Sequence, residues 1–146
     1  MKKVLTAMAL AGAMSLSAIC SAAGEGALLT KEQKAAEAFT AAATGKAEAT
    51  FAAASAGLNA DLKAKVNEKA FGELQKQIKE KLGAAKEINF RAFEHFKDGD
   101  RVVYVGSFAK EQNVVITYVF DSTAKIANFA FTPVKPQPAQ QAPAKK

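Results

Sequence analysis

The amino-acid sequence predicts an α+β fold, in which a helical first half packs on a four-stranded antiparallel sheet. Between residues 30 and 82, apolar residues recur at helical spacing. From Ile88 onward they alternate with polar residues instead, which is typical of strands. Short polar turns divide this second half into four runs, and runs joined by short turns pair in antiparallel fashion.

Two helices are expected in the alanine-rich stretch that follows residue 29. Thr30 and Gln33 form the capping-box pattern, which predicts a helix that starts at Thr30. The sequence Thr44-Gly45 predicts its end, because glycine is the usual residue just past a helix. A second, short helix is expected over residues 46–54.

The strongest helical signal comes next. Asn59 is expected to cap a short helical turn, and Asn67 to cap a helix over residues 67–82 that ends at Gly83. Four large apolar residues form one stripe along this helix: Phe71, Leu74, Ile78 and Leu82. We expect this stripe to lie across the sheet, because the apolar face of the sheet needs a cover.

The first two predicted strands, residues 88–97 and 101–109, flank Asp98-Gly99, a strong hairpin signal. Simple alternation divides the first strand into two faces. One face carries Ile88, Phe90, Ala92, Glu94 and Phe96, and the other carries Asn89, Arg91, Phe93, His95 and Lys97.

A second hairpin is predicted over residues 113–133, which are rich in β-branched and aromatic residues around a short polar break. In its first run, Val114, Ile116, Tyr118 and Phe120 share one face, and Val115, Thr117 and Val119 share the other. Since both faces are mostly apolar, we expect the sheet to be covered on at least part of each side.

The first 23 residues have the pattern of a secretory signal peptide. A basic start precedes an apolar run, and Ser21-Ala22-Ala23 offers the small residues that signal peptidase accepts. We therefore expect a bacterial protein that is periplasmic or secreted. Lipid anchoring at Cys20 is the less favoured alternative, because Ser17 and Ile19 reverse the usual order of residues before a lipidated cysteine.

The rest of the 146-residue chain is expected to hold one domain. We assign residues 24–29 to a lead-in, 30–133 to a single α+β domain and 134–146 to a disordered tail rich in proline, alanine, glutamine and lysine. No transmembrane segment is expected in the mature chain.

The formal net charge of +6 does not indicate a nucleic-acid partner. From Thr30 to Pro133 there are 15 basic and 13 acidic residues, a balance of 15 − 13 = +2, and their charges are interleaved along the helices. A nucleic-acid-binding protein would show a clustered basic surface with aromatic residues among the charges. We expect none here.

Several short segments resemble the bacterial DUF3887 family of domains. They are the helix end Leu82-Gly83-Ala84-Ala85-Lys86 and the strand segments Val102-Val103-Tyr104-Val105, Val119-Phe120-Asp121 and Lys125-Ile126-Ala127-Asn128-Phe129. Ala124 and Asn128 stand where glycine is common in the family. The resemblance implies helices packed on a curved antiparallel sheet, as in nuclear-transport-factor-2-like or cystatin-like folds. It implies no catalytic residues.

Few residues point to chemistry. The chain has no glycine-rich phosphate loop, and its single histidine makes a histidine-based metal site or relay improbable. His95 is more readily a half-exposed residue of the sheet than a general base. Folds of the resembled kind can enclose a pocket between helices and sheet, where the hydroxyl of Tyr104 or Tyr118 would meet a ligand. Arg91 and His95 complete the predicted ligand-binding residues.

These observations favour an exported, non-enzymatic module that binds a small apolar ligand or a protein partner. No metal and no cofactor are expected. Two alternatives stay open at this point. One is an enzyme that uses a buried acid and a tyrosine in a pocket between helices and sheet. The other is a structural homodimer, since sheets of this kind often pair face to face.

Overall fold

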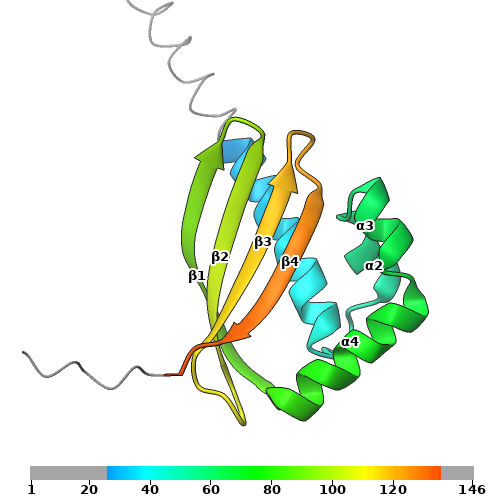
Figure 1. Cartoon of the computed structure of the whole chain (residues 1–146), viewed down its shortest axis with the longest axis vertical. Coiled ribbons are helices and arrows are strands. Elements are labelled where there is room, and N and C mark those ends of the chain that lie inside the picture. The colour runs from blue at the N-terminus through cyan, green and yellow to red at the C-terminus, as the bar shows by residue number, and fades with distance from the viewer. Residues whose placement is uncertain (1–25, 136–146) are drawn as a thin grey trace, which may run out of the picture.

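A computed structural model describes residues 26–135 of the chain (Figure 1). The first element is a helix that covers residues 26–43 of the described part, called the N-terminal helix below. Three helices and four strands follow in the order α2 (Phe51–Ala56), α3 (Ala60–Lys65), α4 (Glu68–Lys81), β1 (Ala85–Phe96), β2 (Gly99–Phe108), β3 (Val114–Asp121) and β4 (Ile126–Pro133). The predicted α+β fold is confirmed.

The strands form one curved sheet in which neighbours in sequence are neighbours in space (Figure 1). All three pairs are antiparallel, so both predicted hairpins are present. The first hairpin turns at Asp98-Gly99 as expected. Gly99 has a φ of 152°, and a Cβ atom there would lie 2.0 Å from the carbonyl oxygen of Phe120. Only glycine allows this close approach to the neighbouring strand.

The N-terminal helix, not α4, lies across the sheet (Figure 1). We call the sheet face toward this helix the inner face. Phe39 on the helix is fully buried, and its ring contacts Tyr118 at 5.9 Å and Phe129 at 4.5 Å between ring centroids. The prediction that α4 covers the sheet is therefore wrong. The small alanine side chains allow the N-terminal helix to approach the sheet closely, with Phe39 filling the space between them.

Helix α4 flanks the N-terminal helix and the β4 edge instead (Figure 1). Its Phe71 packs on Phe39, with ring centroids 5.4 Å apart, and on Phe51 at 5.3 Å. Phe71 and Ile78 are buried, so the stripe predicted for α4 does face the core. Phe71 packs on the N-terminal helix and α2, whereas Leu74 and Ile78 border a groove beside β4.

The opposite face of the sheet, here the outer face, carries no described helix (Figure 1). On β3, Val114, Ile116, Tyr118 and Phe120 are buried, whereas Val115 and Thr117 are half-buried and Val119 is 39% exposed. The expectation that both sides are covered is thus wrong for residues 26–135. β-Branched residues suit a strand whether or not a second layer covers them.

A β-bulge breaks the predicted alternation in β1. Phe90 pairs with Tyr104, but Ala92 pairs with Val103, so Arg91 is the extra residue. An extra residue shifts every later side chain to the other face. Phe93 and His95 therefore share the inner face with Phe90, and the predicted two-face division of this strand is wrong beyond Arg91.

The polar caps of α3 and α4 are where the sequence predicts them. Asn59 Oδ1 accepts a hydrogen bond from Leu62 N–H, and Asn67 Oδ1 accepts one from Ala70 N–H, both at 2.9 Å. Thr30 does not cap a helix, since the N-terminal helix already includes residues 26–29. Its hydroxyl donates to the Gly26 carbonyl instead. The short helix predicted over 46–54 lies at Phe51–Ala56, capped by Thr50.

The ends of the chain lie largely outside the described residues. The predicted signal peptide, Cys20 and the tail from residue 136 onward belong to these parts. Among residues 26–135, no helix combines the length and the apolar character that crossing a membrane requires.

Candidate functional site

The inner face of the sheet is closed over β3. Tyr118 is completely buried, and its hydroxyl forms a 2.6 Å hydrogen bond with the Thr40 hydroxyl of the N-terminal helix. Burial raises the pKa of Tyr118 well above its ordinary value. A buried ring with a satisfied hydroxyl is a core element. The structure thus places Tyr118 beneath the helix, away from solvent.

The same face is open on the β1 side of the helix. A cleft of about 340 Å³ lies there, called the Tyr104 cleft. The helical side contributes Glu37, Thr40, Ala41, Thr44 and Lys46, and the sheet contributes Ile88, Phe90 and Tyr104. Phe90 remains 45% exposed, and its ring meets that of Tyr104 edge to face at 5.9 Å.

Tyr104 is the unusual residue of this cleft. Only 4% of Tyr104 is exposed to solvent, yet its hydroxyl has no hydrogen-bond partner within the described residues. Burial, and then the charge of Glu37, raises the pKa of Tyr104 to about 12. The hydroxyl is protonated at neutral pH, so it has one hydrogen bond to donate. Leaving a buried hydroxyl unpaired costs about 1–3 kcal/mol, so a bound group that accepts this hydrogen bond would be favoured.

A second polar cluster joins the start of the N-terminal helix to the first hairpin. His95 Nδ1 and Asp100 Oδ1 lie 2.5 Å apart, with the His95 side chain 73% exposed and that of Asp100 5% exposed. Glu32 is completely buried, and neither of its carboxyl oxygens has a partner among the described residues. Burial, and then the nearby Asp100 carboxyl, raises the pKa of Glu32 to about 8.

The four predicted ligand-binding residues do not form one site. The rings of Tyr104 and Tyr118 are 6.3 Å apart, but only Tyr104 lines the cleft. Arg91 is exposed at the bulge, and His95 belongs to the cluster with Asp100. No group of three or more metal-ligating side chains is arranged to hold a metal ion in the described part of the chain.

Sequence reasoning missed the helix residues that complete both sites. Glu32, Ala36, Phe39 and Ala43 recur at helical spacing and are all buried, so period alone places Glu32 on the covered face. Thr40 and Glu37 lie beside that face and reach Tyr118 and the cleft. The Asp100 partner of His95 was not predicted, because it depends on pairing across the hairpin.

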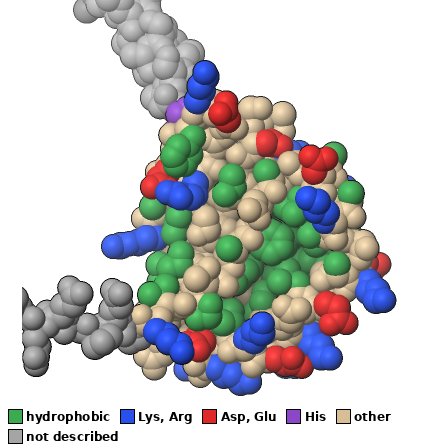
Figure 2. All heavy atoms as spheres, viewed as in Figure 1, with side chains coloured by type: hydrophobic (Ala, Val, Ile, Leu, Met, Phe, Trp, Pro, Cys, Tyr) green, Lys and Arg blue, Asp and Glu red, His purple; other side chains and the backbone are tan. Residues whose placement is uncertain are grey.

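An apolar groove that is larger than the Tyr104 cleft lies on the other side of the N-terminal helix, between α4 and β4. It measures about 540 Å³ and is called the α4–β4 groove. Its apolar lining consists of Leu74 and Ile78 of α4, Leu82 just past the end of α4, and Phe129, Ala130, Phe131 and Pro133 of β4. Figure 2 shows hydrophobic side chains gathered in the hollow beside β4.

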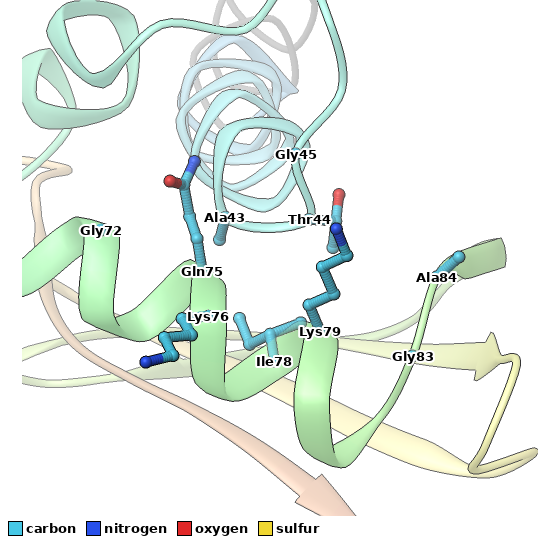
Figure 3. Close-up of a pocket in the computed structure, with 10 residues that line it drawn as sticks. All are labelled: Ala43, Thr44, Gly45, Gly72, Gln75, Lys76, Ile78, Lys79, Gly83 and Ala84. Carbon is cyan, nitrogen blue, oxygen red and sulfur yellow. The ribbon is translucent and has the colours of Figure 1, made fainter.

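A third hollow, of about 480 Å³, lies where the N-terminal helix ends against α4 (Figure 3). Gln75 Nε2 donates to the Ala42 carbonyl at 2.7 Å, which satisfies one of the carbonyl groups that a helix end leaves unpaired. Lys79 extends toward Thr44, whereas Lys76 points away (Figure 3). We interpret this hollow as the junction between the N-terminal helix and α4.

Comparison with known proteins identifies the family of the chain. A family model described as "Protein of unknown function (DUF3887)" matches residues 33–129, which include both hairpins up to Phe129. No curated protein and no solved structure matches the chain. The matched range covers most of the N-terminal helix, α2 to α4, β1 to β3 and the first half of β4. The chain belongs to the DUF3887 family.

Proposed function

We propose that the protein is an exported, non-enzymatic module that binds a small, largely apolar ligand in the Tyr104 cleft. The observation that carries this proposal is the Tyr104 hydroxyl, which is buried beside the cleft without a hydrogen-bond partner among the described residues. Binding sites of small molecules commonly combine apolar walls with a few convergent polar groups. The Tyr104 cleft has this composition.

The lining residues define the ligand class. Ile88, Phe90 and Ala41 provide apolar contact, and Tyr104 donates one hydrogen bond to an acceptor on the ligand. Lys46 and Glu37 lie at the same cleft, so the ligand end nearest them is polar. A flat, mostly apolar molecule with one hydrogen-bond acceptor fits this pattern, because aromatic rings prefer edge-to-face or offset contact with Phe90.

The protonation state of Tyr104 suits a hydrogen-bond donor. A phenol with a pKa of about 12 stays protonated at neutral pH, so it donates a hydrogen bond and does not act as a base. The exposed His95 beside Asp100 is the strongest feature in favour of the enzyme alternative. Neither residue lines the Tyr104 cleft.

Titration with the dye 1-anilinonaphthalene-8-sulfonate tests the cleft, because the dye pairs a flat apolar body with a sulfonate acceptor. We expect Tyr104→Phe to weaken binding by about tenfold through the lost hydrogen bond. Phe90→Ala should weaken binding as well. Val119→Ala is the control and should bind like the wild type, because Val119 lies on the outer face of the sheet, away from the cleft. Unchanged binding in both cleft variants would remove the proposal.

The export part of the proposal comes from the first 23 residues of the sequence. Intact mass spectrometry of the native protein, recovered from the periplasm or medium, should show a mature chain that starts after Ala22 or Ala23. Spectra recorded under non-denaturing conditions should also show any small molecule that purifies with it. A full-length chain found only in the cytosol would contradict export and leave the cleft proposal to the dye titration.

A further inference from the structure

The outer edge of β4 carries backbone groups that the rest of the sheet does not use. β4 is the last strand of the sheet and pairs with β3 on one side only. On its other side, Ile126 N–H donates to the Gly57 carbonyl at 2.8 Å, and Asn59 N–H donates to the Ile126 carbonyl at 2.9 Å. Leu58 thus forms a one-residue parallel bridge to this edge. The free edge of β4 therefore already forms backbone hydrogen bonds at its first residue, Ile126.

Farther along β4, the outward groups can be assigned from the ladder. Val134 N–H donates to the Asn113 carbonyl at 2.8 Å, so the alternation of an antiparallel pair turns Thr132 and Ala130 toward β3. Phe129 and Phe131 then direct their N–H and C=O groups outward. In agreement, Phe129 N–H is bonded to the side chain of Asn128 at 2.8 Å. Pro133, in phase with them, has no N–H to leave unpaired.

This edge borders the α4–β4 groove. The side chains of Phe129 and Phe131 line the groove on one side, and Leu74, Ile78 and Leu82 line it on the other. A strand added to an edge lies about 4.8 Å from its neighbour and directs alternate side chains to the same face. A strand beside β4 would therefore place every second side chain in the groove.

We propose that β4 and the α4–β4 groove bind an extended polypeptide segment, which adds to the sheet as a fifth strand with alternating apolar side chains. Strand addition uses main-chain hydrogen bonds for affinity and side-chain pockets for specificity, and both are present here. A small apolar molecule would fill the groove but leave the edge groups unpaired. This proposal concerns a different surface from the Tyr104 cleft.

The charges beside the groove refine the partner. Lys81 lines the groove together with Gln77, one helical turn earlier, and forms no ion pair within residues 26–135. The segment is therefore expected to carry an acidic side chain on the same face as its apolar residues. Asn128 protects the edge in the free protein, as side chains on natural edge strands often do, and moves aside when the segment binds.

The test uses a fluorescein-labelled, amidated peptide with the sequence Val-Thr-Val-Thr-Glu-Thr, in which the glutamate shares one face with the two valines. Its matched control is the same peptide N-methylated at every residue, which keeps the side chains and removes the backbone donors of both edges. We expect saturable binding in fluorescence anisotropy and at least roughly tenfold weaker binding after N-methylation, since several hydrogen bonds are lost. The backbone amide of Phe131 should shift in the NMR spectrum and exchange more slowly with solvent.

Protein variants separate this surface from the cleft. Lys81→Glu should weaken binding of the peptide by about threefold, the size expected for an exposed ion pair, and Lys69→Glu on the same helix should not. Tyr104→Phe should leave peptide binding unchanged even if dye binding is lost. Equal binding of both peptides, or no binding, would overturn strand addition while leaving the cleft proposal intact. Self-association of the protein would also overturn the proposal if it protects the Phe131 amide and is not reversed by added peptide. A second copy of the chain would then occupy the edge.

Discussion

Two tyrosines on the inner face show how one helix closes half of a sheet and leaves the other half open. Tyr118 on β3 and Tyr104 on β2 lie 6.3 Å apart between ring centroids. Tyr118 shares its hydroxyl with Thr40 below the helix, whereas the Tyr104 hydroxyl is buried without a partner beside a cleft. Both rings are buried, so burial alone does not distinguish a core tyrosine from a candidate ligand-binding one. The pairing of the hydroxyl does.

Phe39→Ala should cause the largest loss of stability among the variants considered. Phe39 fills the space between the helix and the sheet, and truncating a buried phenylalanine costs about 4 kcal/mol of unfolding free energy. Urea denaturation followed by circular dichroism would measure the loss. Phe90→Ala is the matched control on the open side, where the ring is 45% exposed and the expected loss is about 1 kcal/mol. Similar losses in the two variants would contradict the assignment of a closed and an open half.

Glu32→Gln should change how stability depends on pH. The pKa of Glu32 rises from 4.5 to about 8 on folding, so the folded protein binds more protons than the unfolded chain between these values. Stability is then lost as the pH rises from about 4.5 to about 8. The variant cannot ionise, so its free energy of unfolding should fall less, by roughly 2 kcal/mol, between pH 5 and pH 8.

Thermal unfolding at both pH values would measure this difference. Glu73→Gln serves as the control, because Glu73 is exposed on α4 and the same substitution should leave the pH profile as in the wild type. A wild-type protein whose stability is constant from pH 5 to pH 8 would show that Glu32 is not buried beside Asp100 as described.

Tyr118→Phe should cost about 1 kcal/mol, because it removes a buried hydrogen bond and leaves the Thr40 hydroxyl with only the Ala36 carbonyl. A double-mutant cycle with Thr40→Val would measure the coupling directly. If the two losses simply add, the Thr40 and Tyr118 hydroxyls do not interact in solution.

Tyr104→Phe should have the smallest effect on stability. Removing an unpaired buried hydroxyl is neutral or slightly stabilising, within about 0.5 kcal/mol. Parallel urea titrations of the two tyrosine variants test this point. A loss equal to that of Tyr118→Phe would mean that Tyr104 has a hydrogen-bond partner within the protein.

Much of the fold is predictable because its signals are local. Asn59 and Asn67 cap the helices that follow them, and Asp98-Gly99 forms the hairpin turn. The face of β3 that carries Tyr118 is buried as its alternation indicates. Even the departure from the family pattern at Ala124 has a local meaning, since that residue adopts a φ of 58° where glycine would be unstrained.

The candidate site is less predictable because it depends on how segments far apart in the sequence meet. The bulge at Arg91 redirects Phe93 and His95, and nothing in the residue types of β1 specifies it. The stripe on α4 is longer and more apolar than the face of the N-terminal helix, yet the alanine-rich helix covers the sheet. Small side chains allow a closer approach than the hydropathy pattern alone suggests.

The helices, the strands, their order and the two hairpins can be predicted from the amino-acid sequence alone, because each follows from periodicity, caps and turn residues within a few positions. Tertiary contacts determine which helix lies on the sheet, which tyrosine hydroxyl is paired and that Asp100 is the neighbour of the buried Glu32. These properties depend on the distance and burial of groups from different segments, and periodicity specifies a face without specifying what covers it.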